Sequence, residues 1–416
     1  MSRIRSVVIV NHYAGGPDIG SGWRHYELAR RWSAAGVATT IVTASTAIGG
    51  DQGPSRTRDR EVDGVFFRFV PCRSYRGNAA PRLLNMLDFV RGCRRALGTH
   101  TRERGRPSAI VASSPQPFAW GPSRAAARAA EAMFVPEVRD LWPESLVDIG
   151  GVSRIHPLVL ACRAVRGRAM READLVFSPL AHFHRHAEAF GLANARCIHV
   201  PNGVTISHEH GDPRQAGTPD GRRRLLYAGA MGLPNALEDL IAATGRLSPD
   251  ERSRISVVMV GDGTQRARLE ASAKSECPGV FAFLGSLPQP DTEALARTCN
   301  AAVIAWKPHP LYRFGTSPQK VPFYLACGLP VIAASPDEDD PVRTQQLGWW
   351  SPAGDISGLA RSLRQFIVAD AATLRTTAQR CRDHARRALD WDTIATRALD
   401  ALEMRAATRL AAVPSP

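Results

Sequence analysis

Short apolar runs alternate along the chain with amphipathic stretches and polar turns. In the first half, mainly apolar runs predict buried strands at residues 6–11, 38–43, 65–70, 109–113, 134–138, 174–178 and 197–200. Residues 23–35 and 82–97 instead carry apolar side chains at helical spacing. Strands that alternate with helices indicate a parallel, doubly wound sheet.

This alternation stops at a polar segment rich in Gly, Pro, Asp and Arg, which predicts a linker at residues 206–224. It then restarts, with strands predicted at residues 225–228, 256–260, 280–284, 301–305 and 330–334. Helices are predicted within residues 233–247, 266–274, 291–297 and 319–327. Residues 359–403 have a helical pattern with a break around residues 389–392. The second half is therefore expected to form another α/β sheet.

Length and composition agree with two Rossmann-like domains. A chain of 416 residues is too long for one ordinary core, and its 44% apolar content is normal for a globular protein. No stretch approaches the roughly 20 apolar residues needed to span a bilayer. The short apolar run near the start ends in Asn-His-Tyr without a small-residue cleavage site, so we predict a strand there rather than a signal peptide. Doubly wound sheets bind ligands at the carboxyl ends of their strands, so a nucleotide-linked substrate in a cleft between the domains is expected.

The net charge of +14 is concentrated in the first half of the chain. Residues 1–200 contain 28 Arg and 16 acidic residues, a net charge of +12, and the remainder carries +2. The only lysines are Lys274, Lys307 and Lys320, and this Arg bias can also reflect genomic base composition. A basic N-terminal half favours an anionic partner such as a membrane surface or a phosphorylated substrate. Nucleic acid is not expected, because no recognised binding module is present.

The eight cysteines are scattered along the chain and form no CxxC pair. This arrangement argues against a zinc or redox site and favours a reducing cytosol. The stretch HFHRH could place His182 and His186 on one helix face, but this spacing alone is weak evidence for a metal, and we predict none.

The stretch GTSPQK, residues 315–320, combines a predicted helix start with a lone lysine and no acid before Asp337. Thr316 or Ser317 can cap the helix, and Pro318 suits its first turn. Lys320 would oppose the helix dipole, a mild cost that indicates a role in binding an anion together with free backbone amides. We therefore predict a phosphate site here.

Three further motifs allow both a functional and a structural interpretation. AGGPDIGSG, residues 14–22, separates a strand from a helix, where glycines admit a close ligand, but a flexible connection would look the same. EVRDLWPES, residues 137–145, places charges after a strand, either towards a ligand or in a salt-bridged turn. VGDGTQRARLE, residues 260–270, contains a tight turn that needs small residues whatever its role.

The helix predicted at residues 82–97 has an apolar stripe beside a basic side. The stripe and the basic side consist of Leu83, Leu84, Leu87, Val90 and Leu97, and of Arg91, Arg94 and Arg95. A peripheral membrane helix has this pattern, and so has an ordinary helix that faces a core.

These segments occur in an order that resembles one enzyme family. The set includes the AGGPDIGSG loop, RPSAIVASSPQPFAW, EVRDLWPES, VPNGV, LLYAGAMGLPNALEDLI, VMVGDGTQRARLE and TSPQKVPFYLACGLPVIAA, and lies within residues 6–335. It is similar to the GT-B-fold, retaining sugar-nucleotide glycosyltransferases of family GT4. The branch it resembles most comprises bacterial O-antigen, capsule and exopolysaccharide enzymes, such as the N-acetyl-L-fucosaminyl transferases.

The resemblance implies a function and a domain plan. The expected reaction moves a hexosyl or N-acetylhexosaminyl group from a nucleoside-diphosphate sugar, with UDP favoured, to a lipid-linked or glycan acceptor in cell-surface polysaccharide synthesis. Residues 1–205 would form the acceptor-side domain, 225–388 the donor domain, and 389–416 a helix that crosses back to the first domain. No cofactor or tightly bound metal is implied. A cytoplasmic location is expected, with the basic N-terminal domain against the inner face of the cytoplasmic membrane.

The resemblance also implies roles for individual residues. Arg139, Asp140 and Lys320 are the expected catalytic residues, with Lys320 neutralising the diphosphate leaving group. The expected donor-binding residues are Gly20, Ser21, Gly22, Gly229, Gly232, Gly261, Asp262, Ser286, Leu287, Thr316, Ser317 and Lys320. We place Arg24 and Glu144 on the acceptor side.

The chain departs from the family at two positions. Many members carry two glutamates eight positions apart, one near the donor sugar and one on the ribose, where this chain has Gly315 and Phe323. Pro322 also removes a backbone donor from the predicted helix. One alternative is therefore a GT-B binding or regulatory subunit without turnover. Another is a GT-B sugar-nucleotide epimerase, which would need a buried acid–base set that the sequence does not identify.

Overall fold

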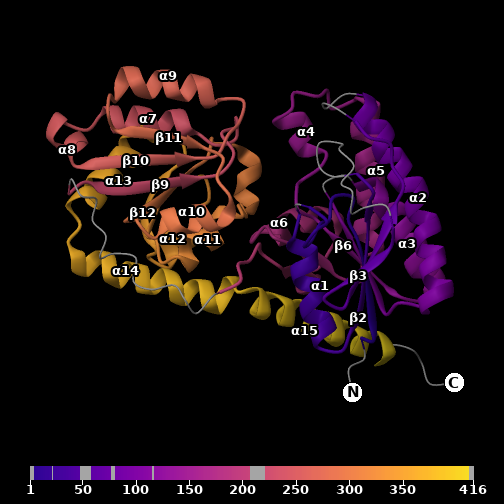
Figure 1. The fold of residues 1–416 in the computed structure, drawn as a ribbon. Coiled ribbons are helices and arrows are strands. Elements are labelled where there is room, and N and C mark those ends of the chain that lie inside the picture. Colours follow the sequence, from indigo (N-terminus) through magenta and orange to yellow (C-terminus); the bar gives the residue numbers. More distant parts are fainter. Residues whose placement is uncertain are drawn as a thin grey trace. The chain divides into compact units, whose positions relative to one another are not determined.

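The structure is a computed structural model that describes residues 4–20, 22–46, 58–75, 80–114, 117–206 and 221–411 (Figure 1). The chain divides into two compact units, which are described separately. Unit 1 comprises Met1–Pro201 and Trp391–Pro416, and unit 2 comprises Asn202–Asp390. Most of the predicted linker, residues 207–220, lies outside the described residues.

Unit 1 contains, within its described residues, an eight-stranded sheet with the order β3-β4-β2-β1-β5-β6-β7-β8. The edge strand β3 is antiparallel to β4, and the other pairs are parallel. The strands are β1 Ser6–Val10, β2 Ala38–Ala44, β3 Arg60–Val62, β4 Val65–Val70, β5 Ala109–Ser113, β6 Met133–Glu137, β7 Val176–Ser178 and β8 Cys197–His199.

Helices cover both faces of this sheet. They are α1 Arg24–Ala34, α2 Ala80–Arg104, α3 Trp120–Ala130, α4 Glu144–Asp148, α5 Pro157–Glu172, α6 Phe183–Ala187 and α15 Trp391–Ala411. Helices α1 and α15 pack together on one face, where Trp32 Nε1 donates a hydrogen bond to the Ala395 carbonyl over 2.9 Å. Helices α2, α3 and α5 lie side by side (Figure 1). The end of the chain therefore completes the core of the unit that its beginning forms.

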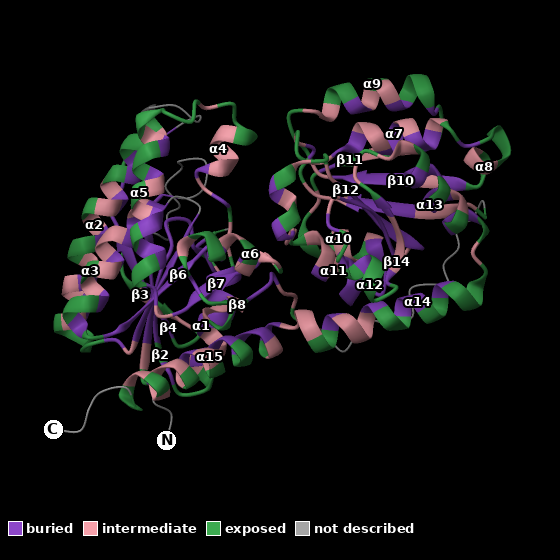
Figure 2. Cartoon of the chain, turned by 180° about the vertical axis from the view of Figure 1, so that it is seen from behind, coloured by how far each residue is buried: buried purple, intermediate pink, exposed green. Residues whose placement is uncertain are grey.

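Unit 2 contains, within its described residues, a six-stranded parallel sheet with the order β11-β10-β9-β12-β13-β14. The strands are β9 Arg223–Ala228, β10 Ile255–Val260, β11 Phe281–Gly285, β12 Ala301–Ala305, β13 Val331–Ser335 and β14 Gly348–Pro352. The strands of both sheets are mostly buried, whereas the helices expose one side (Figure 2).

Two apolar layers enclose the sheet of unit 2. The helices are α7 Leu237–Gly245, α8 Pro249–Ser253, α9 Arg266–Glu276, α10 Gln289–Ala296, α11 Lys320–Ala326, α12 Pro341–Thr344, α13 Ile356–Val368 and α14 Ala371–His384, followed by the π-helix η6 Ala385–Leu389. Helices α7, α9 and α13 pack on one core cluster, and α11 and α14 belong to another. The helical pattern predicted at residues 359–403 has an additional break, because Asp370 caps α14 by accepting from the Thr373 backbone N–H over 2.7 Å.

The predicted fold class is confirmed for both units, which are Rossmann-like parallel α/β sheets. Strands predicted at residues 65–70, 109–113 and 301–305 have the observed bounds. Two edge strands, β3 and β14, were not predicted. Strand β3 has only three residues, and β14 contains Gly and Pro, which weaken a strand signal.

Helix α2 does not use the predicted apolar stripe as one surface. Its buried residues are Asn85, Met86, Phe89, Cys93, Leu97 and His100, whereas Leu83, Leu84 and Leu87 are exposed. Arg91, Arg94 and Arg95 are exposed as well. Among the described helices, none has the length and apolar character needed to cross a bilayer.

Candidate functional site

The carboxyl edge of the unit 2 sheet carries most of the predicted donor-binding residues. Gly229 and Gly232 follow β9, Gly261 and Asp262 follow β10, and Ser286 and Leu287 follow β11. Backbone hydrogen bonds tie these loops together: Gly229 N–H donates to the Val260 carbonyl over 2.9 Å, and Gly261 N–H donates to the Gly285 carbonyl over 2.7 Å. The sheet therefore fixes the backbone of this edge, where parallel α/β proteins bind ligands.

Lys320, the first residue of α11, reaches the end of β9. Its Nζ donates to Tyr227 Oη over 2.9 Å and to Asn235 Oδ1 over 3.3 Å. The ammonium also lies 4.2 Å from the centre of the Tyr227 ring, a cation–π distance. Among the described residues, no carboxylate forms an ion pair with Lys320.

The absence of a side chain at Gly229 leaves room for the end of the Lys320 side chain. A β-carbon at that position would lie 2.9 Å from both Cε and Nζ of Lys320, and the glycine φ of +152° strains other residues. The predicted donor residues Gly229 and Lys320 are therefore in direct contact, although 91 positions in sequence separate them.

A second tyrosine docks α11 on the same strand. Tyr324 lies one helical turn after Lys320, and both its hydroxyl contacts are with Ala228: it accepts from the backbone N–H over 2.6 Å and donates to the carbonyl over 3.2 Å. Tyr324 and Tyr227 are both fully buried. Residues 320 and 324 therefore act as one face of α11 against the end of β9.

The Lys320 ammonium is a half-buried cation that no carboxylate among the described residues neutralises. Burial lowers the pKa of Lys320 to about 8. Burial also raises the pKa of Tyr227, so this phenol is neutral at physiological pH and serves as a hydrogen-bond acceptor for the ammonium. A binding anion would stabilise the charged lysine, because an opposite charge at short range favours ionisation.

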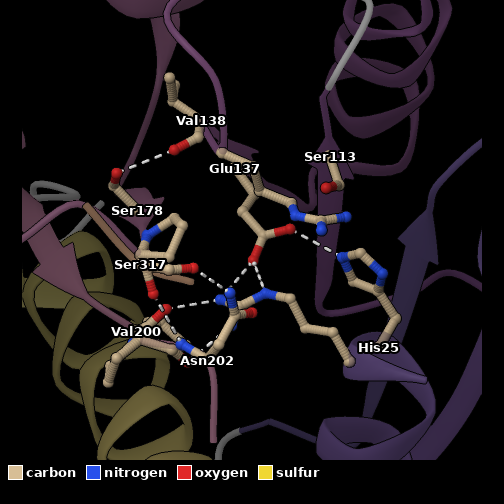
Figure 3. A network of polar contacts seen from close by, with 12 residues as sticks. His25, Ser113, Glu137, Val138, Ser178, Val200, Asn202 and Ser317 are labelled. Atoms are coloured by element: carbon tan, nitrogen blue, oxygen red, sulfur yellow. Dashed lines mark hydrogen bonds and ion pairs between the residues drawn. The ribbon is translucent and has the colours of Figure 1, made fainter. Parts of the chain in front are cut away.

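The GTSPQK loop differs from its sequence prediction in one respect. Helix α11 begins at Lys320, with Gln319 as its N-cap and no side-chain cap, so the predicted capping by Thr316 or Ser317 is wrong. Ser317 instead binds Asn202: its Oγ accepts from the Asn202 backbone N–H over 3.2 Å, and its carbonyl accepts from Asn202 Nδ2 over 2.6 Å (Figure 3). The VPNGV motif thus holds the loop in place.

The structure places the three unusual residues of this segment. Pro322 is the third residue of α11, where a backbone N–H has no partner within the helix, so proline removes no helical hydrogen bond. Gly315 has φ +95° and ψ 163°, a backbone conformation that a glutamate would adopt only with strain. Phe323 is half-buried and packs against the core cluster below α11.

Unit 1 contains a different kind of polar cluster, which is fully buried (Figure 3). Glu137, the last residue of β6, accepts from Arg24 Nε over 2.9 Å and from Arg24 Nη2 over 2.8 Å. Its other carboxylate oxygen lies 2.7 Å from His25 Nε2. Arg24 Nη1 and Nη2 also donate to the carbonyls of Pro201 and Val200, both over 2.6 Å.

Opposing effects set the charges of this cluster. Burial raises the pKa of Glu137, but Arg24 and His25 outweigh that effect and hold the pKa well below its ordinary value. Burial lowers the pKa of His25 despite the neighbouring carboxylate, so the imidazole is neutral at physiological pH. The cluster is thus an arginine–glutamate ion pair completed by a neutral histidine.

This cluster corrects the predicted role of Arg24. The side chains of Arg24 and Glu137 are each only 1% exposed, so Arg24 is not available to a glycan acceptor. Within EVRDLWPES, Glu144 binds Arg166 through two contacts, one of them 2.8 Å long. The salt-bridged interpretation of this motif therefore holds for both glutamates, and the acceptor role of Glu144 stays a prediction.

The remaining predicted residues of unit 1 lie in two loops, one after β6 and one between β1 and α1. Arg139 is half-buried and Asp140 is exposed, and the Ser114 hydroxyl accepts from both backbone N–H groups, over 2.8 and 3.4 Å. Gly20 pairs with Gly16, and Gly22 packs against the Tyr13 carbonyl. Ser21 lies outside the described residues.

Two family models match the chain, one in each unit. The model described as "Glycosyl transferase 4-like domain" matches residues 20–203, and the model described as "Glycosyl transferases group 1" matches residues 222–368. No curated protein sequence matches the chain.

Solved structures with similar folds span the whole chain. Sucrose-phosphate synthase from Thermosynechococcus elongatus matches with a TM-score of 0.72 at 16% identity, covering 98% of this chain and 99% of that chain. Anabaena HepE in complex with UDP matches with a TM-score of 0.66 at 15% identity, covering 99% of this chain and 100% of that chain. WaaG, a glycosyltransferase involved in lipopolysaccharide biosynthesis, matches with a TM-score of 0.65 at 14% identity, covering 95% of this chain and 99% of that chain. These likenesses establish the fold, which is that of GT-B glycosyltransferases.

Proposed function

This chain belongs to the glycosyltransferases that join a glycosyl transferase 4-like domain to a group 1 domain, and on that premise we propose that it transfers a sugar from a nucleoside-diphosphate sugar. UDP is the favoured nucleotide. The Anabaena neighbour was solved with UDP and with UDP-glucose, which supports this choice.

One observation carries the proposal. Lys320 is a partly desolvated ammonium at the carboxyl edge of the unit 2 sheet, held by two neutral groups and by no carboxylate among the described residues. An isolated buried charge is costly unless a partner of opposite charge arrives. The diphosphate of a sugar nucleotide supplies that charge.

The lysine would act on the leaving group. Negative charge develops on the diphosphate as the bond to the sugar breaks, and a preorganised cation stabilises this charge most strongly in a water-poor site. No bound metal is needed for this step in the proposal. Asp140 and Arg139 remain the proposed residues that face the reacting sugar, and Asp140→Asn is expected to lower turnover while leaving UDP binding intact.

A binding screen followed by an activity assay tests the donor site. Purified protein is heated with UDP, GDP, ADP, CMP or TDP, because a ligand that binds only the native state raises its apparent stability. We expect a shift with UDP that Lys320→Ala abolishes. Lys274→Ala is the matched control, because this exposed lysine on α9 lies outside the site. Acceptor-dependent UDP release is expected to fall about 10²–10³-fold in Lys320→Ala, and unchanged release would refute the role of Lys320.

The finer features of the reaction follow the family resemblance. We propose retention of the anomeric configuration, transfer of a hexosyl or N-acetylhexosaminyl group, and a lipid-linked or glycan acceptor in cell-surface polysaccharide synthesis. Proton NMR of the first product formed reads the anomeric configuration directly. An inverted product would contradict the proposed mechanism without affecting the donor site.

Helix α2 supports attachment to an anionic membrane surface. At about 100° per residue, its exposed leucines and arginines fall within roughly 120° of the helix circumference. These residues are Leu83, Leu84, Leu87, Arg91, Arg94 and Arg95. We expect co-sedimentation with vesicles that contain phosphatidylglycerol, and its loss in a variant with all three arginines changed to Gln. Equal binding to neutral vesicles would contradict this attachment.

A subunit that binds the donor without turnover is the second candidate function. Phe323 favours it, because a half-buried phenyl ring stands where the family resemblance implies a ribose-binding carboxylate. A UDP-induced shift in stability without acceptor-dependent UDP release, over a panel of lipid-linked acceptors, would select this function.

A further inference from the structure

We propose that Tyr227 and Asn235 position the Lys320 ammonium so that the site takes up a proton when it binds a diphosphate, and that the Tyr227 hydroxyl sets the pH above which binding weakens. This inference rests on the proposed donor site. It adds a positioning role for two residues and a coupling between protons and ligand.

The hydrogen bonds around Lys320 have a fixed direction. The Ala230 carbonyl accepts from Tyr227 Oη over 2.6 Å and from Asn235 Nδ2 over 3.0 Å. Because the tyrosine hydrogen and the amide N–H group are both directed at Ala230, the Tyr227 oxygen lone pairs and Asn235 Oδ1 remain for the ammonium. One backbone carbonyl therefore orients both acceptors towards Lys320.

These two acceptors leave part of the ammonium available. A lysine ammonium has three N–H donors, and Tyr227 and Asn235 engage two of them. Among the described residues, no further acceptor hydrogen-bonds to Nζ. The third donor can bind a phosphate oxygen without breaking either existing contact.

Among the residues that the structure describes, no charged group compensates the ammonium of Lys320. On β9 the titratable neighbour is Tyr227, and on α11 it is Tyr324, both neutral phenols whose pKa burial raises. At the start of α7, Glu238 is paired with Lys307. From α14, Arg382 packs against Gly328 beyond the other end of α11. Burial is accordingly the cause of the lowered pKa of Lys320, about 8.

Ligand binding must then be linked to protonation. A diphosphate stabilises the charged lysine and raises its pKa, so the complex holds a proton that the free protein partly lacks above pH 8. Below about pH 7 the ammonium is already formed, and affinity is independent of this group. Above pH 8 the affinity is expected to fall by about tenfold per pH unit, because each unit lowers the protonated fraction by that factor.

Tyr227→Phe separates positioning from packing. The phenyl ring keeps its place in the core and its cation–π contact, but the oxygen that accepts from Nζ is lost. The midpoint of Lys320 titration is expected to fall by about one pH unit, the size of one hydrogen bond to a charged group. Affinity at pH 6 should change much less than affinity at pH 8.5. Tyr26→Phe is the matched control, because its hydroxyl binds Asp63 in unit 1.

The small number of lysines makes the test direct. Protein labelled with 13C-lysine gives three side-chain Cε signals, for Lys274, Lys307 and Lys320, and Lys→Arg variants assign them. We expect the Lys320 signal to titrate near pH 8 in the free protein. Saturating UDP, or inorganic pyrophosphate as the minimal probe, should move this midpoint upwards by more than one pH unit and leave the other two signals unchanged.

The outcomes separate this inference from the proposed function. A free-protein midpoint at the ordinary lysine value of about 10.4 would overturn it, as would a midpoint that bound UDP leaves unmoved. Tyr227→Phe with the wild-type midpoint would overturn the role of the hydroxyl. If neither UDP nor pyrophosphate binds at any pH from 6 to about 9, as judged by thermal stability, the donor site itself fails.

Discussion

The buried cluster of unit 1 allows a stability prediction with a large expected effect. Glu137→Gln keeps the size of the side chain but removes the charge that Arg24 faces at 2.8 and 2.9 Å. The buried guanidinium would then lose this charged partner and keep the Val200 and Pro201 carbonyls among its contacts. Removing one partner of a buried ion pair typically costs about 3–5 kcal/mol. For a unit of about 200 residues this lowers the unfolding midpoint by about 10 °C.

The assay must report on unit 1 alone, because a chain with two separate cores need not unfold in one step. Hydrogen exchange of peptides from β1, β5 and β6, measured along a urea titration, provides that resolution. Glu172→Gln is the matched control, since this partly exposed glutamate pairs with Arg124 and Arg168 at the surface. Its loss should cost no more than about 1 kcal/mol. A Glu137→Gln effect of the same small size would refute the argument from burial.

The loss of stability in the same variant is expected to depend on pH. The pKa of Glu137 is lowered in the folded protein, so its carboxylate stabilises the fold fully above the unfolded value of about 4.3. That stabilisation is lost as the pH falls through the lowered folded value. The stability difference between wild type and Glu137→Gln should therefore be complete at pH 7 and shrink only below about pH 4.

Three further substitutions test the site in unit 2. Gly229→Ala places a methyl group 2.9 Å from Lys320 Nζ, so UDP affinity measured by calorimetry should fall at least about tenfold with folding retained. Tyr324→Phe leaves two part-buried backbone groups of Ala228 without the hydroxyl, which should lower stability towards urea by about 1–3 kcal/mol. Gly315→Glu, which introduces the family residue, should cost about 1–3 kcal/mol and give no gain in turnover. A gain would show that the loop adopts another conformation.

The sequence was sufficient for the elements that local patterns specify. Mainly apolar runs gave the interior strands, because a strand covered on both faces needs apolar side chains at nearly every position. It was insufficient where a single polar contact decides a boundary. The break before α14 depends on Asp370 as an N-cap, a weak signal within a long helical pattern. The polar edge strand β3 carries no apolar run at all.

The candidate site was predictable only in part, for a related reason. Lys320 was found from its position at a predicted helix start without a nearby acid, and Gly229 from the family resemblance. Tyr227 was missed, because a tyrosine within a mainly apolar strand has the pattern of a core residue. In the structure it is a core residue as well as a contact of Lys320. Arg24 was assigned to an acceptor because no spacing rule links it to Glu137, 113 positions away. Contacts of this range are set by the order of strands in the sheet.

Glu137, which is buried, and Lys320, which is half-buried, illustrate the difference between a structural and a functional charge. Glu137 is neutralised within the protein by Arg24, so a ligand has nothing to add, and its loss should appear in stability. Lys320 is surrounded by neutral acceptors that fix its position and leave its charge uncompensated. Holding it costs free energy in the empty protein, and a diphosphate would recover that cost on binding. A carboxylate beside Lys320 would stabilise the empty site and weaken the attraction for the anion. The absence of an acid from GTSPQK is therefore the feature that makes this lysine effective.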